Sequence, residues 1–230
     1  RIPYRLDLAG GWLDQPYVSK FWPGAVLTIS IEPDLEFNDR SGMSSSTRKK
    51  AVELWHTDIP DGDPQLLART LFCLENPPGT TYVSGSQDAI GIVFPGLNRL
   101  DYAAGEYWPE KITTVNDPEV LGWLEQRLWF ITLPPRAGGF NVLDETNISV
   151  EGAMALAEAA DGVWKAVLAR DIEGLGRSYK ASFEAQVAMF PLMKSRVVSE
   201  TIDLYKDRAL AWKLAGAGGG GYLAMVSERP

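Results

Sequence analysis

The 230-residue chain contains one cysteine, Cys73, and one histidine, His56. A single cysteine excludes an internal disulfide framework and zinc sites built from several cysteines, and a single histidine excludes histidine-rich metal sites. The scarcity of cysteine fits a reducing compartment, so we expect a cytoplasmic protein. No apolar run approaches the roughly 18 residues of a membrane-spanning helix, so we expect no membrane protein.

Positive charge is also scarce. The chain has 22 Lys and Arg against 30 Asp and Glu, which gives a net charge of -8. Nucleic acids and anionic membranes are bound by basic faces, so we expect neither as a partner. The 45% of hydrophobic and 23% of charged residues are typical of a globular protein. Because the chain begins at Arg1 without a methionine or a leader-like segment, we expect it to be a piece of a longer one or a chain from which disordered ends have been omitted.

Apolar periodicity and turn residues predict strands in the first half with two helices among them, then a helix-rich second half that ends on a strand. This order predicts an α+β fold. We expect a boundary within 107–117, which gives an N-terminal domain over 1–110 and a C-terminal domain over 111–230. The expected strands are 5–9, 25–31, 89–94, 97–102, 128–133 and 222–226, and the expected helices are 47–55, 64–75, 150–170, 172–189 and 194–210.

Glycine is abundant, with 22 residues, and part of it gathers in three places. The first is the segment from Arg5 to Asp14, in which a strand leads into Gly10 and Gly11 and then into a carboxylate. Glycine allows a close approach of the backbone, so Asp14 could bind the hydroxyls of a polar ligand. On its own, the segment fits an ordinary strand and tight turn better.

The second place is a serine-rich segment that opens the helix expected over 47–55. Unpaired N–H groups at a helix N-terminus bind phosphate well, and a serine hydroxyl can also bind magnesium. The segment lacks the Walker A pattern. An ordinary serine cap explains it equally well. The residues that would surround a phosphate are Gly42, Met43, Ser44, Ser45, Ser46 and Thr47.

The third place lies between the last helix and the last strand, where Gly216 is followed by glycine at 218–221. Five glycines in six positions are costly in chain entropy, which favours a loop kept for close approach to a ligand over a flexible linker. Two acids complete the set of candidates. Asp88 lies between a turn and an apolar segment, and Glu75 ends the helix expected over 64–75, although either could be a simple surface residue.

Together, and in this order, the three segments resemble the GHMP small-molecule kinases, named for galacto-, homoserine, mevalonate and phosphomevalonate kinases. The Leu-Ala-Gly-Gly-Trp-Leu-Asp run at 8–14 and the Ser-Gln-Asp run at 86–88 are similar to the branch that phosphorylates fucose and heptose phosphates. The resemblance spans nearly the whole chain. It implies a two-domain α+β structure with the active-site cleft between the domains.

The resemblance also implies roles. Asp88 would be the acidic residue at the acceptor hydroxyl, as base or as electrostatic anchor, and Arg5 would stabilise negative charge beside it. Asp14, Gly11, Gly218 and Gly219 would bind the sugar. The segment 42–47 would wrap the phosphates of ATP, and Ser46 and Glu75 would reach Mg²⁺. ATP and Mg²⁺ are thus the expected cofactors, and the acceptor would be a sugar or sugar phosphate, phosphorylated at an anomeric hydroxyl.

The chain departs from the family pattern at three points. Ser44 replaces the usual second glycine and Thr47 the usual alanine, and the interval between Asp14 and Gly42 is short. Two alternatives stay open. One is a non-catalytic sugar- or nucleotide-binding regulatory protein of the same fold, and the other is a kinase of a non-sugar alcohol. The sequence does not settle the oligomeric state.

Overall fold

The computed structural model describes residues 1–33, 37 and 42–228. Its strands form two antiparallel sheets. The first has the order β1-β2-β3-β4, and the second has the order β5-β7-β6. The strands are β1 (Tyr4–Ala9), β2 (Gly24–Ile31), β3 (Leu97–Tyr102), β4 (Lys111–Val115), β5 (Leu128–Thr132), β6 (Ala211–Leu214) and β7 (Tyr222–Val226).

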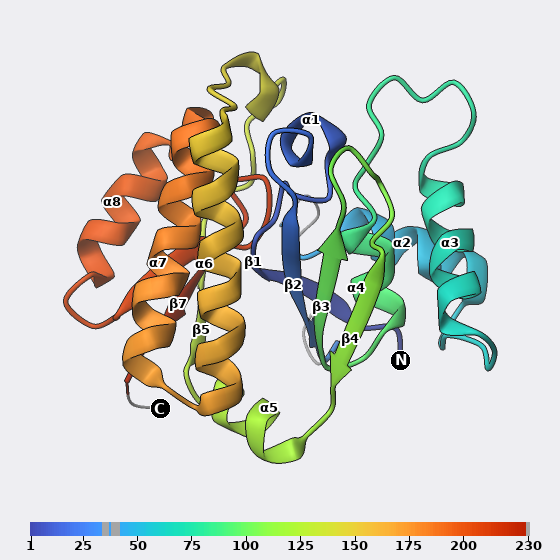
Figure 1. Ribbon diagram of the computed structural model, residues 1–230, viewed down its shortest axis with the longest axis horizontal. Coiled ribbons are helices and arrows are strands. Elements are labelled where there is room, and N and C mark those ends of the chain that lie inside the picture. Colours follow the sequence, from blue (N-terminus) through green and yellow to red (C-terminus); the bar gives the residue numbers. More distant parts are fainter. Residues whose placement is uncertain (34–36, 38–41, 229–230) are drawn as a thin grey trace.

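Helices lie on both sides of these strands (Figure 1). Helices α6, α7 and α8 form one side of the molecule, and α2, α3 and α4 form the other. The helices are α1 (Pro16–Ser19), α2 (Ser45–Trp55), α3 (Pro64–Glu75), α4 (Gln87–Val93), α5 (Pro118–Glu125), α6 (Val150–Ala169), α7 (Ile172–Met189) and α8 (Arg196–Tyr205), with 3-10 turns η1 (Val142–Asp144) and η2 (Pro191–Met193).

The α+β fold expected from the sequence is confirmed. Helix α3 begins with a capped N-terminus, because Asp63 accepts a hydrogen bond from the Gln65 N–H and Pro64 opens the helix. Ser149 caps α6 in the same way through the Gly152 N–H. Among the described residues, no helix is both long and apolar enough to cross a bilayer.

The sequence-based assignment was wrong in two segments and missed several elements. The segment 89–94, expected as a strand, belongs to α4 apart from Phe94, because a short apolar run fits a buried helix equally well. The helix expected over 194–210 ends at Tyr205, and the chain then enters β6. Strands β4 and β6 and helix α5 were not predicted.

The two-domain division stays a prediction. Strand β4 pairs with β3 from Leu97↔Val115 to Asp101↔Lys111, so a boundary at 110/111 would fall inside this hairpin. Helix α6 of the second half packs against β2 of the first sheet.

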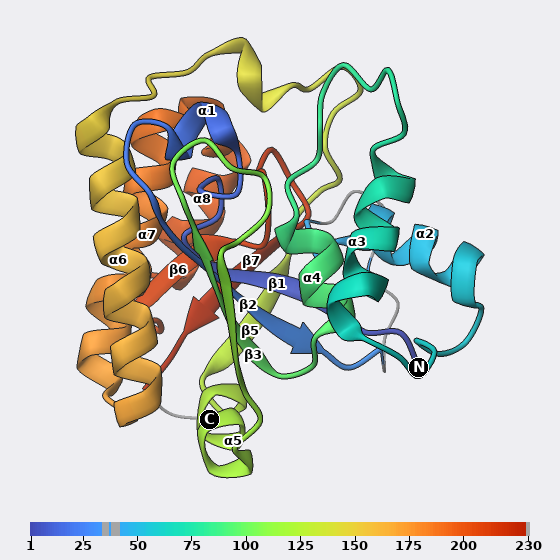
Figure 2. The ribbon, with the colours of Figure 1, turned by 45° about the vertical axis from the view of Figure 1, so that its right-hand side comes forward.

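Strand β1 separates the core from the pocket described below. Successive side chains of a strand point to opposite faces. Leu6 and Leu8 lie fully buried in the hydrophobic cluster that includes Val163 of α6. Arg5 and Asp7 alternate with them and line the pocket. In the turned view, β1 runs through the middle of the molecule with α4 beside it (Figure 2).

Candidate active site

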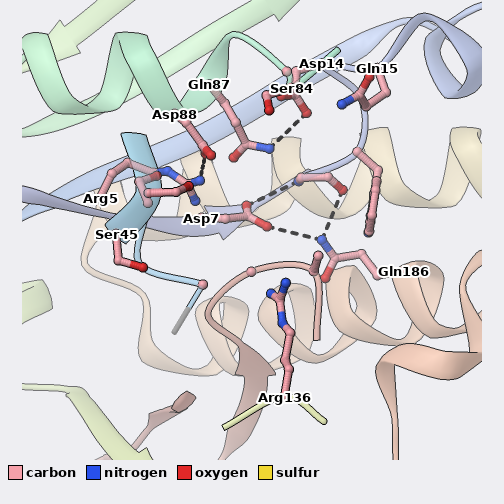
Figure 3. Close-up of a pocket in the computed structure, with 18 residues that line it drawn as sticks. Arg5, Asp7, Asp14, Gln15, Ser45, Ser84, Gln87, Asp88, Arg136 and Gln186 are labelled. Carbon is pink, nitrogen blue, oxygen red and sulfur yellow. Dashed lines mark hydrogen bonds and ion pairs between the residues drawn. The ribbon is translucent and has the colours of Figure 1, made fainter. Parts of the chain in front are cut away.

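A pocket of about 440 Å³ brings the three glycine-containing segments together. Its wall is formed by residues from β1 and the turn after it, the start of α2, the start of α4, α7 and the loop after β6 (Figure 3). The lining residues are Arg5, Asp7, Gly11, Trp12, Asp14, Gln15, Gly42, Ser44, Ser45, Ser46, Ser84, Gly85, Gln87, Asp88, Arg136, Gln186, Gly216 and Ala217.

Arg5 and Asp88 form an ion pair in this pocket, between Nη2 and Oδ1. The Arg5 side chain is 5% exposed and that of Asp88 24% exposed. Arg5 comes from β1, and its Cγ lies so close to Gly91 of α4 that a Cβ there would collide with it. Burial lowers the pKa of Arg5, and the carboxylates of Asp7 and Asp14 oppose this shift. The pocket therefore holds a carboxylate and a buried guanidinium side by side.

Asp14 is buried in the same wall, and Gln87 Nε2 donates a hydrogen bond of 2.9 Å to its Oδ1. Gly85 packs directly against Asp14 Oδ2, where any Cβ would collide. Burial raises the pKa of Asp14 to about 6, although Arg5 and the Gln87 hydrogen bond lower it. Asp14 and Asp88, predicted from segments far apart in sequence, thus lie in one pocket.

A buried polar cluster fixes the turn after β1. Asp7 accepts hydrogen bonds from the Gly11 N–H at 3.2 Å, from Gln186 Nε2 at 3.2 Å and from Lys213 Nζ at 2.7 Å. Gln186 Nε2 also donates to the Gly11 carbonyl at 3.0 Å. Both polar groups of Gly11 are therefore held by side chains. Asp7 lies within the first candidate segment but had no predicted role, and no sequence pattern pointed to Gln186.

Trp12, the next residue of that turn, has φ of 93°, a left-handed conformation that is rare for a tryptophan. Its ring stacks on Phe190 with centroids 4.1 Å apart, and its Nε1 lies 3.4 Å from Met193 Sδ. These contacts offset the backbone strain, which is about 1–3 kcal/mol for such a residue. Trp12 lines the pocket through this arrangement.

The start of α2 lies at the pocket without a side-chain cap. Ser44, its N-cap residue, has φ of 53°, makes no capping hydrogen bond, and has a buried hydroxyl without a partner among the described residues. Ser45 and Ser46 also line the pocket. The first N–H groups of a helix carry partial positive charge, so this uncapped end suits an anion.

Of the remaining residues of the predicted phosphate segment, Gly42 also lines the pocket, whereas Met43 and Thr47 do not. Gly42, with φ of +80°, packs on the third glycine segment, where a Cβ would lie 2.8 Å from the Gly216 nitrogen. Met43 and Thr47 are buried and do not line the pocket. Met43 accepts a hydrogen bond through its carbonyl from the Arg5 N–H. The segment is thus joined both to β1 and to the loop after β6.

Ser46 and Glu75, the predicted magnesium ligands, do not lie side by side at the pocket wall. Ser46 is exposed and lines the pocket, whereas Glu75 is not among the lining residues. Thr47 Oγ1 donates a hydrogen bond of 2.7 Å to Glu75 Oε1, and burial raises the pKa of Glu75. Among the described residues, no three His, Cys, Asp or Glu side chains gather as a metal-binding group.

Gly218 and Gly219, predicted to bind the sugar, are not among the lining residues of this pocket. A Cβ at Gly218 would lie 2.7 Å from Met193 Cα, and one at Gly219 would lie 2.5 Å from the Phe140 ring. Gly216 and Ala217 line the pocket in their place. Arg136, which follows β5, was not predicted either. In Figure 3 its side chain extends toward the pocket from the side away from Gln87.

Solved structures share this architecture over almost the entire chain. The galactokinase of Lactococcus lactis in complex with galactose is 14% identical, with a TM-score of 0.68 over 98% of this chain and 84% of that chain. The phosphomevalonate kinase of Streptococcus pneumoniae, in complex with phosphomevalonate and AMPPNP, is 12% identical, with a TM-score of 0.65 over 100% of this chain and 92% of that chain. The chain has the GHMP-kinase fold. The resemblance inferred from the three segments is thereby confirmed at the level of the fold.

Sequence similarity to the GHMP kinases is weaker than the likeness in fold. No model of a known protein family matches this chain. The bifunctional fucokinase/GDP-fucose pyrophosphorylase of Arabidopsis thaliana is 24% identical over 198 residues, which cover 80% of this chain. They cover 18% of that protein, so the chain corresponds to less than a fifth of its length.

Proposed function

We propose that this GHMP-fold chain transfers a phosphoryl group from ATP to the anomeric hydroxyl of a sugar or sugar phosphate. The observation that carries the proposal is the Arg5–Asp88 pair, which lies in the same pocket as the uncapped N-terminus of α2. Phosphoryl transfer depends mainly on positioning and on neutralising charge. The galactokinase and fucokinase similarities support a sugar as the acceptor.

In this reaction Asp88 takes the proton from the acceptor hydroxyl as its oxygen bonds to the γ-phosphorus, and the bond from phosphorus to the oxygen of ADP breaks. Arg5 forms an ion pair with the Asp88 carboxylate and stabilises the negative charge on the transferring group. Asp14 accepts hydrogen bonds from hydroxyls of the sugar. The N–H groups and serines at the start of α2 hold the phosphates of ATP.

The residues present fit a triphosphate and a magnesium ion. The Ser44 hydroxyl and Glu75 Oε2 are buried oxygens without partners among the described residues, and Ser46 adds a hydroxyl at the pocket. Hydroxyl and carboxylate oxygens are the ligands that Mg²⁺ prefers. Ser46 would hold the ion at the pocket together with phosphate oxygens, Glu75 would support it from outside the pocket lining, and the ion would neutralise phosphate charge.

A coupled assay of ADP release tests the proposal, with L-fucose, D-galactose, D-mannose and heptose phosphates as acceptors and ATP and Mg²⁺ present. Asp88→Asn should lower kcat about 100-fold or more, with the KM for ATP unchanged. Asp61→Asn, at an exposed position outside the pocket, is the matched control. Unchanged turnover in Asp88→Asn would refute the role of Asp88.

The two alternatives predict different results in the same assay. Tight binding of sugar or ATP without turnover of any acceptor would favour the regulatory protein. Turnover of mevalonate or phosphomevalonate alone would favour the non-sugar kinase, a possibility that the phosphomevalonate kinase fold keeps open. Asp14→Ala separates these cases, because a sugar kinase should lose acceptor affinity in this variant.

A further inference from the structure

Three glutamines line the pocket, and each comes from a different segment. Gln15 precedes α1, Gln87 opens α4 and Gln186 lies in α7. Each amide nitrogen donates a hydrogen bond to the protein. The acceptors are the Val83 carbonyl for Gln15 at 3.2 Å, Asp14 Oδ1 for Gln87 at 2.9 Å, and Asp7 Oδ2 with the Gly11 carbonyl for Gln186.

The amide oxygens have no such partners. Oε1 of each of the three glutamines is buried and has no hydrogen-bond partner within the described residues. The orientation of each carboxamide is fixed, because a flip would turn its oxygen against a carboxylate or a carbonyl, which are acceptors only. The pocket wall therefore contains three carboxamide oxygens whose lone pairs lack donors.

Gln186 is held most firmly of the three. Its side chain is 1% exposed, and its two hydrogen bonds end on groups that are themselves restrained. Asp7 is fixed by Lys213, and Gly11 is fixed by Asp7. A buried acceptor without a donor is unfavourable, so a ligand that supplies a donor to Oε1 gains affinity.

The chemistry of these oxygens defines the ligand group that they accept. A hydroxyl can donate one hydrogen bond, whereas an ionised phosphate can only accept and would be repelled by carboxamide oxygens and by Asp14. We propose that Gln186, with Gln15 and Gln87, forms a subsite that recognises free hydroxyl groups of the acceptor, and that Gln186 determines its specificity. The inference rests on the proposed function for the identity of its ligand as a kinase acceptor.

The test compares wild type with two variants at position 186. Gln186→Met removes both the donor and the acceptor. The double variant Gln186→Lys/Lys213→Met removes the amide oxygen of residue 186 but keeps one lysine donor for the Asp7 carboxylate. It therefore separates recognition of the ligand by Oε1 from support of the turn at Gly11. Gln126→Met, at an exposed site outside the pocket, is the control.

Two measurements are made on each protein. Calorimetry gives the affinity for L-fucose, D-galactose, D-mannose and their monodeoxy analogues, and the coupled assay gives the KM for the acceptor and for ATP. Both position-186 variants should weaken acceptor binding and raise the acceptor KM about ten-fold, while the KM for ATP changes less than about two-fold. The analogue that lacks the recognised hydroxyl should bind wild type and variants equally.

The possible results separate this inference from the proposed function. Wild-type turnover with an unchanged acceptor KM in both folded variants would overturn the subsite and leave the kinase standing. Sugar binding without turnover, weakened in both variants, would support the subsite and refute the kinase. If the wild type neither bound nor phosphorylated any of the sugars, both would be wrong.

Discussion

Lys213 Nζ lies 2.7 Å from Asp7 Oδ2, and the two side chains are 0% and 4% exposed. Burial lowers the pKa of Lys213, and the adjacent Asp7 carboxylate opposes that shift. The pair joins β1 of the first sheet to β6 of the second, directly behind the turn at Gly11. Each charge therefore compensates the free-energy cost of burying the other.

Removal of one member of this pair should destabilise the protein strongly. Lys213→Met leaves Asp7 as an uncompensated buried charge, which costs about 3–5 kcal/mol in the free energy of unfolding. The double variant Asp7→Asn/Lys213→Met should lose less than the sum of the two single variants. Urea denaturation of the wild type, the two single variants and the double variant measures this coupling. Strictly additive losses of unfolding free energy would contradict it.

The buried Asp14 makes stability depend on pH. Its pKa is about 6 in the folded protein, against an ordinary value of 3.8. The folded state therefore holds this proton more tightly, and the stabilisation is present at low pH and lost as pH rises through about 6. Relative to Asp14→Asn, the wild type should lose up to about 3 kcal/mol between pH 4 and pH 7. If the difference in unfolding free energy between the two proteins stayed constant from pH 4 to pH 7, the burial of Asp14 would be contradicted.

The contact between Gly42 and Gly216 should be needed for binding ATP. Gly42→Ala adds a Cβ 2.8 Å from the Gly216 nitrogen and should raise the KM for ATP roughly ten-fold or more by displacing the start of α2. Gly105 is a matched control, since its φ of +79° is equally left-handed but a Cβ there meets nothing within 4 Å. Gly105→Ala should leave the KM for ATP unchanged. If both substitutions raised the KM for ATP equally, backbone strain alone would explain the increase and the contact with Gly216 would not be needed.

Glu75 should influence the requirement for magnesium. Glu75→Gln removes the negative charge but keeps an oxygen that can accept the hydrogen bond of Thr47. The Mg²⁺ concentration for half-maximal activity should rise about ten-fold, as for other residues that support a metal site. Glu125→Gln, at an exposed position, serves as the control. An unchanged magnesium dependence would refute the role of Glu75.

Much of the pocket could be predicted from the sequence because its residues stand in recognisable local patterns. The strand with two glycines, the serine-rich helix start and the last glycine loop each predicted a site, and the structure places Arg5, Asp14, Ser46 and Asp88 in one pocket. The helix at 87–93 was mistaken for a strand because seven mostly apolar residues are too few to distinguish the two periodicities.

The buried polar cluster could not be predicted for a different reason. Asp7 and Lys213 are 206 positions apart, and neither sits in a pattern that names its partner. Gln186 lies in the middle of a helix, where a single glutamine carries no signal. The role of Gly218 and Gly219 in binding the sugar stays a prediction. A glycine-rich loop indicates a close approach, and in the structure Met193 and Phe140 lie close to these two glycines.

The packing of Gly42 on Gly216 has a consequence for biosynthesis. A ribosome releases the start of α2 long before the loop after β6, so the nascent chain carries half of the pocket without its other half. Contacts between such distant positions form late, because the intervening chain must first be ordered. The pocket should therefore be complete only when nearly all of these residues have left the ribosome.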